Sequence, residues 1–161
     1  MGWKGMHIVE CDPDVILVSS LASISVRRIV HAGGKHQVLR RLLKQRDSIG
    51  MIDEDPLSIQ PRRFLQKFVE IDNLERDKLK ILHYAQGNDR LIVLCPRLEE
   101  WIVETCRVAN VELRRHNLPD DPIRLHGIIN FRLNRFQRLV EDLIRQSDRV
   151  RTLRDRLTEP I

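Results

Sequence analysis

The chain has 161 residues, with 42% hydrophobic and 32% charged side chains, a composition that excludes intrinsic disorder and predicts a folded domain with a sizeable core. Its net charge of +5 is compatible with a polyanionic partner. No apolar run is long enough to cross a bilayer, and the first residues lack the apolar core of a signal peptide, so we expect no membrane association. Cys11, Cys95 and Cys106 form neither a Cys-x-x-Cys pair nor a zinc spacing, which favours reduced thiols and a cytoplasmic location.

Strand and helix patterns alternate along the first third of the chain, and this order is typical of βαβ units around a parallel sheet. We expect β-strands at 6–9, 27–31 and 49–53, a helix from an N-cap at Asp12 to about residue 23, and a second helix after the glycine turn at 33–35.

The middle of the chain predicts a helix from Pro61 to Val69 and another over 98–108. Two strands at 79–84 and 91–95 flank a turn at 87–89, and they form either a hairpin or two edge elements. Asp120 or Asp121 is expected to cap the helix that follows Pro119.

Residues 128–157 have a helical pattern in which an apolar stripe is surrounded by arginines. An unbroken helix of this length would span about 40 Å, so it bends near Ser147, lies across the domain or projects to a partner. The arginines form a solvated face, a nucleic-acid contact or the border of a homodimer interface along the stripe. We therefore divide the chain into an α/β domain at 1–118 and a helical C-terminal extension at 119–161, packed on it or mediating association.

Acidic residues are expected to meet at one edge of the sheet. Asp53 and Asp55 end the 49–53 strand on one side, with Glu54 on the other. Glu10 ends the first strand, and Asp14 follows one helical turn later. Ligands of open parallel sheets bind at the carboxyl ends of the strands, where these carboxylates could share Mg²⁺. The alternative is an acidic turn that merely ends a strand.

Three segments together resemble the Toprim domain, the metal-binding module of topoisomerases, primases and OLD-type nucleases: Ile8 to Val15, Ala32 to Lys35, and Ile52 to Asp55. The resemblance covers residues 6–56. It implies a three-layer α/β fold with a mostly parallel sheet and Mg²⁺, or alternatively Mn²⁺, held by Glu10, Asp53 and Asp55. The Glu-x-x-x-Asp form of the first motif is similar to the OLD-type nucleases, in which Asp14 would serve a second metal.

A later segment, Pro96 to Trp101, is similar to a Pro-x-x-Glu-x-Trp stretch of small stand-alone Toprim proteins, and this adds Glu99 to the metal site. Cys11 departs from the family pattern, which usually has glycine after the first glutamate. Lys35 is expected to contact phosphate and assist catalysis, with Gly33 and Gly34 forming the phosphate-binding turn. The simpler alternative is that turn geometry requires the glycines and that Lys35 is a solvated turn residue.

These residues favour a metal-dependent nuclease acting on DNA or RNA, alone or with a partner ATPase, with Glu10, Lys35, Asp53 and Asp55 as catalytic residues. Glu10 could alternatively act as a general base. The competing hypothesis is a non-catalytic module that binds a protein or nucleic acid through its basic C-terminal helix. A weaker third hypothesis is a phospho-receiver, which leaves the Gly-Gly-Lys turn unexplained.

Overall fold

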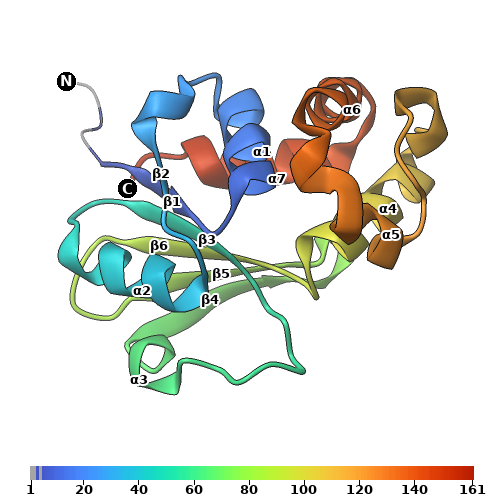
Figure 1. Ribbon diagram of the computed structural model, residues 1–161. Helices are drawn as coiled ribbons and strands as arrows, with labels where there is room; N and C mark the ends of the chain where they lie inside the picture. Colours follow the sequence, from blue (N-terminus) through green and yellow to red (C-terminus); the bar gives the residue numbers. More distant parts are fainter. Residues whose placement is uncertain (1–2, 4) are drawn as a thin grey trace.

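A six-stranded sheet lies between two layers of helices in the computed structural model, which describes residue 3 and residues 5–161 (Figure 1). The strand order is β2-β1-β3-β6-β5-β4. β2, β1, β3 and β6 are mutually parallel, and β5 runs antiparallel to both of its neighbours. The expected α/β class with a mostly parallel sheet is therefore confirmed. The strands are β1 (His7–Val9), β2 (Ile29–His31), β3 (Ile49–Asp53), β4 (Phe68–Leu74), β5 (Leu79–Tyr84) and β6 (Arg90–Leu94).

The helices are divided unequally between the two faces of the sheet. α2 and α3 cover one face, whereas α1, α4, α6 and α7 cover the other (Figure 1). α5 packs against α4. The α-helices are α1 (Asp12–Ala22), α2 (Lys35–Lys44), α3 (Arg62–Leu65), α4 (Leu98–Ala109), α5 (Pro122–Ile128), α6 (Leu133–Gln146) and α7 (Asp148–Thr158).

Each face of the sheet has its own core because side chains alternate along the strands. In β1, Ile8 packs with α2 whereas Val9 packs with α1 and the C-terminal helices. Gly50 in β3 allows α2 to approach closely, since a Cβ there would lie 2.9 Å from Leu42 Cδ2. The core under α1, α4, α6 and α7 is the larger one and contains Trp101 and Phe136, both fully buried.

Several element boundaries differ from the sequence-based expectations. The helix expected from Pro61 to Val69 is wrong beyond Leu65, because Phe68 and Val69 begin β4, which pairs with β5 at the edge of the sheet. Residues 26–28 form a 3₁₀ turn, so the second strand starts only at Ile29. The two strands at 79–84 and 90–94 form the hairpin alternative, with β6 inside the sheet.

The C-terminal helical segment bends at Ser147, one of the three alternatives given above. The Ser147 side chain accepts a hydrogen bond from the Val150 amide and caps α7, which packs with α6 against α1. The apolar stripe on these helices enters the core of the chain itself. Asp121 caps α5 by accepting from the amides of Ile123 and Arg124. Among the described residues, none of the helices combines the length and apolar character needed to traverse a bilayer.

Candidate functional site

The carboxyl ends of β1 and β3 bring Glu10 and Asp53 together. The two strands pair in parallel with Val9 opposite Met51, so the residues that follow them meet at the same edge. The Glu10 Oε2 atom accepts a hydrogen bond of 2.7 Å from the Asp53 backbone amide. Residues that are 43 positions apart along the chain are therefore in direct contact at this edge.

Asp55 joins Glu10 and Asp53, whereas Glu54 points elsewhere. Asp53 and Asp55 line one cleft with Glu10. The Glu54 carboxylate instead pairs with Lys80 Nζ at 2.8 Å, on the other side of the β3 segment. Asp55 has a φ of +44°, so the chain turns sharply directly after the strand. The alternation expected from sequence is thus observed.

Asp14 lies buried beside this group and holds the start of α1. Its Oδ2 atom accepts from the Cys11 amide at 3.2 Å and from Cys11 Sγ at 3.1 Å, so Cys11 is the N-cap and the expectation of Asp12 is wrong. The position is set by Asp14 at N3, which reaches back to the residue before the helix. The second oxygen, Oδ1, is buried and has no hydrogen-bond partner among the described residues.

Glu99 reaches the group from the first turn of α4, and sequence reasoning missed the residue that contacts it. The buried Glu99 carboxylate lies 2.9 Å from His126 Nδ1, and the imidazole of His126 is 75% exposed. The Leu98 amide at the same helix terminus favours the charged form of Asp53 and lowers its pKa against the larger effect of burial. His126 lies in α5, and no motif spacing links it to Glu99.

Burial raises the pKa of several of these carboxyl groups, because the low-dielectric surroundings disfavour the charged form. The pKa of Asp53 is raised to about 8 by burial and by the neighbouring charges of Asp14 and Glu10. The pKa of Asp14 is raised to about 7, again chiefly by burial and with a contribution from Glu10. The pKa of Glu10 is also raised by burial, against the opposing effect of the Asp53 amide and Lys35.

The glycine turn and Lys35 form the other wall. Gly33 has a φ of +97°, a conformation that suits glycine, and a Cβ there would meet no neighbouring atom within 4 Å. Gly34 is the N-cap of α2. Lys35 Nζ donates to the Glu54 carbonyl at 2.7 Å and to Gln60 Oε1 at 3.1 Å, so it ties the loop after β3 to α2.

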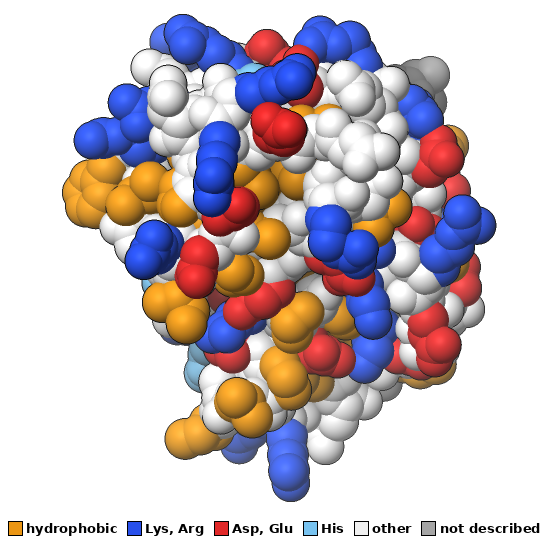
Figure 2. All heavy atoms as spheres, turned by 90° about the vertical axis from the view of Figure 1, so that its right-hand side faces the viewer, with side chains coloured by type: hydrophobic (Ala, Val, Ile, Leu, Met, Phe, Trp, Pro, Cys, Tyr) orange, Lys and Arg blue, Asp and Glu red, His pale blue; other side chains and the backbone are white. Residues whose placement is uncertain are grey.

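A cleft of about 250 Å³ opens between these walls. Glu10, Asp53 and Asp55 line one side, Lys35 and His36 line the other, and the loop at 58–61 closes it. Asp14 and Glu99 lie behind it, close enough to influence the Asp53 charge. Figure 2 faces this end of the molecule and shows acidic and hydrophobic side chains next to each other on it.

The chemistry of these groups fits a hard divalent cation, which prefers several oxygen ligands. A buried, unpartnered Asp14 oxygen and neighbouring acids with raised pKa values are features that a cation would relieve. Within the described part of the chain, no three His, Cys, Asp or Glu side chains are already grouped tightly enough to hold a metal ion.

The arrangement thus offers a polar cleft, a row of carboxylates and one lysine, all at the carboxyl edge of a parallel sheet. The resemblance to the Toprim domain continues to rest on the three short sequence motifs. In comparisons with known proteins, no family model, no curated protein and no solved structure matches this chain.

Proposed function

We propose that this protein is a Toprim-like, divalent-metal-dependent enzyme that cleaves phosphodiester bonds in nucleic acid. The observation that carries the proposal is the contact between the Glu10 carboxylate and the Asp53 amide, which places Glu10, Asp53 and Asp55 along one cleft. These three acids would hold Mg²⁺ or Mn²⁺, and Asp14 and Glu99 behind them would hold a second ion.

The carboxylates repel one another without a cation, and this repulsion favours separated side chains. Metal binding would therefore require small side-chain rotations and the release of protons from Asp14 and Asp53, whose pKa values are raised to about 7 and about 8. When bound, the metal would neutralise phosphate charge and activate water.

The residues of the chain would orient the substrate around that centre. Lys35 fixes the loop through Glu54 and Gln60, which shapes the cleft and leaves a positive charge near Glu10. Glu10 could alternatively transfer protons, because burial raises its pKa toward neutral pH. Gly33 and Gly34 set the start of α2, where backbone amides could meet a phosphate oxygen.

The test is cleavage of end-labelled single- and double-stranded DNA and RNA with Mg²⁺ or Mn²⁺, against an EDTA control. Asp53→Asn and Asp55→Asn are expected to lower cleavage by about 100-fold or more, the scale on which loss of one charge-stabilising group acts. Glu54→Gln is the matched control, since Glu54 lies between them in sequence but pairs with Lys80. Its cleavage rate should stay near that of the wild type.

Calorimetric titration of Mn²⁺ into the same variants measures the metal site independently. Binding by the wild type and by Glu54→Gln, but not by Asp53→Asn, is the expected result. If no variant binds metal and no substrate is cleaved, the proposal fails, and a non-catalytic module becomes the better description.

A further inference from the structure

The positive charge of the chain is concentrated on the α2 and α3 side of the sheet. Residues 33–46 and 56–69 contain eight Lys and Arg residues and no Asp or Glu. The whole chain has a net charge of only +5, so the remainder is acidic, with a net charge of −3. We call the exposed cations of these two segments the basic layer: Arg40, Arg41, Lys44, Arg46, Arg62, Arg63 and Lys67.

None of the side chains of the basic layer forms an ion pair or hydrogen bond with another described residue. The arginines from Arg145 onward differ, because each of them lies beside an acid. Arg145 pairs with Asp142, Arg151 pairs with Asp148, and Arg156 pairs with Asp72 at 2.6 Å. Arg132, Arg135 and Arg138 also lack an acid partner among the described residues, but acids pair with the arginines that follow them. The segments around α2 and α3 therefore differ in presenting unpaired positive charge with no acid in between.

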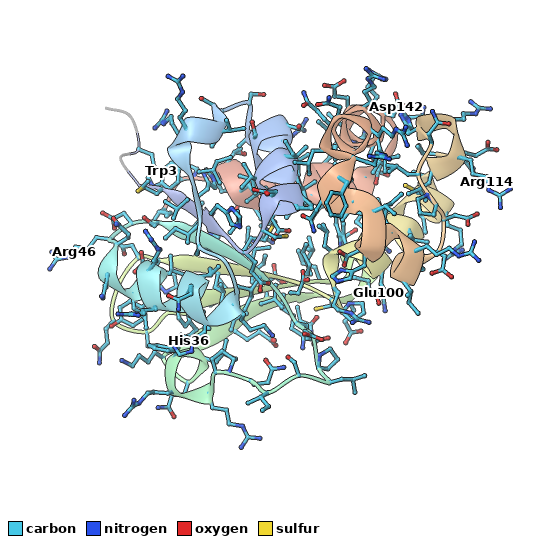
Figure 3. The ribbon with its side chains drawn as sticks, viewed as in Figure 1. Trp3, His36, Arg46, Glu100, Arg114 and Asp142 are labelled. Carbon is cyan, nitrogen blue, oxygen red and sulfur yellow. The ribbon has the colours of Figure 1, made fainter. Side chains whose placement is uncertain are left out.

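The basic layer is continuous with the cleft. His36 lines the cleft and packs edge-on against Phe64 of α3, with ring centroids 4.9 Å apart. α2 runs away from the cleft for about 15 Å, and Arg46 extends into solvent beyond its far end (Figure 3). Arg114 projects on the opposite side of the molecule in the same view.

We infer that the basic layer binds the phosphate backbone of a nucleic acid and directs it into the cleft. The inference rests on the proposed function for what happens in the cleft, but the binding itself needs no metal. A length of about 15 Å corresponds to about four phosphates of one strand. Exposed cations spread along two helices and just beyond their ends suit a repeating phosphate backbone better than a small anion.

Two exposed aliphatic side chains support the same partner. Leu57 and Ile59 are 96% and 98% exposed on the loop after β3, and Ile59 lines the cleft. Apolar side chains beside a phosphate-binding surface can contact unstacked bases. The same combination of cations and aliphatic groups could contact an anionic membrane, so the experiment includes that outcome.

Fluorescence anisotropy with labelled single- and double-stranded DNA and RNA, in EDTA and at several salt concentrations, tests the inference. The patch variant combines Arg40→Gln, Arg41→Gln, Arg62→Gln and Arg63→Gln. It should bind at least 10-fold more weakly than the wild type at low salt, and the slope of log K against log salt should fall by about 3.

The matched control removes four positive charges from the other side of the sheet: Arg107→Gln, Arg114→Gln, Arg115→Gln and Arg145→Gln. The side chains of these arginines are 67% to 81% exposed, but each lies beside an acid. Binding by this variant should change by less than 3-fold. Circular dichroism verifies that each variant folds. A second patch variant combines Lys44→Gln, Arg46→Gln and Lys67→Gln.

Equal losses in the patch and control variants, or no nucleic-acid binding by the wild type, would overturn the inference. So would patch-dependent sedimentation with phosphatidylserine vesicles in the absence of nucleic-acid binding. Asp53→Asn should retain full binding in EDTA. Patch-dependent binding without cleavage would therefore leave this inference standing while the proposed enzymatic function failed.

Discussion

The two sides of the sheet contain similar residue types but use them differently. On the α1, α4, α6 and α7 side, the arginines from Arg145 to Arg156 pair with acids, and the larger core contains Trp101 and Phe136. On the α2 and α3 side the core is smaller, and the cations of the basic layer have no ion-pair partner among the described residues. The comparison shows that the number of basic residues in a segment does not reveal where positive charge is available to a ligand. A basic residue is available to a ligand only where no acid of the same chain pairs with it.

The largest expected effect tests whether the α6 and α7 side belongs to the same folding unit as the sheet. Phe136 is fully buried in α6 and shares a core with α1 and β3. Phe136→Ala should lower the free energy of unfolding by about 3–5 kcal/mol, because it removes a large side chain and leaves a cavity. Urea denaturation followed by circular dichroism should show one transition. Leu39→Ala, under α2, is the control on the other face and should cost about 2–5 kcal/mol. A separate early transition in Phe136→Ala would mean that residues 119–161 unfold independently.

The carboxylates between the two layers give a pH-dependent prediction. The pKa of Asp53 is raised to about 8 in the folded state, whereas an unfolded Asp titrates near about 3.9. The folded state therefore binds more protons in this window, and stability is lost as pH rises from about 4 to about 8. Burial is the main cause of the raised pKa of Asp53, and the charges of Asp14 and Glu10 raise it further. The positive charge of Lys35 lowers the pKa of Glu10 and so favours its charged form.

Asp53→Asn cannot ionise and should lose less stability over the same pH range. The difference in unfolding free energy between the two proteins should grow with pH and level off above about pH 8. Thermal unfolding in EDTA across this range measures it. Parallel curves for the two proteins would contradict a raised pKa for Asp53. Added Mn²⁺ should stabilise only the wild type, and most strongly at high pH.

The next prediction compares one arginine from each side of the sheet. Arg149 is 8% exposed, lies 3.5 Å from the Glu104 carboxylate and donates to the Arg76 carbonyl at 3.0 Å. Arg149→Gln should cost about 2 kcal/mol, because it removes a buried charged donor from two partly buried acceptors. Arg41→Gln removes an exposed and unpaired cation, and it should change stability by less than about 0.5 kcal/mol. Urea denaturation midpoints measure the stability loss of each variant. Equal losses would contradict the distinction between a paired arginine on one side of the sheet and an unpaired one on the other.

Much of the fold follows from the sequence where a pattern is local. β1, β3 and α4 have buried apolar residues in runs and spacings typical of strands and helices. The pairing of β1 with β3 is compatible with right-handed crossovers but was not fixed by the pattern. β4 was missed because Phe64, Leu65, Phe68 and Val69 have helical spacing. The alternation from Val69 to Asp72 is that of a strand, but its apolar residues Val69 and Ile71 lie on an exposed face.

The site was predictable only in part for a related reason. Glu10, Asp53 and Asp55 follow strands, and strand order brings such residues together. The contact between Glu99 and His126 depends on how α5 folds back on α4, and no periodicity encodes that return. The sequence also directed attention to the arginine-rich C-terminus, since ion pairs with distant acids such as Asp72 are invisible along the chain.

The smallest effect concerns the start of α5, the short helix that presents His126 to Glu99. Asp121 caps it through the amides of Ile123 and Arg124, whereas α2 on the opposite side begins at Gly34 without a side-chain cap. Asp121→Ala should cost about 1 kcal/mol. Asp120→Ala is the neighbouring control: Asp120 is exposed and lies 3.5 Å from Arg114, so its loss should cost less than about 0.5 kcal/mol. Thermal midpoints of both variants measure the difference. Equal shifts would show that packing on α4 alone holds α5 in place. The position of His126 would then depend on that packing and not on the Asp121 cap.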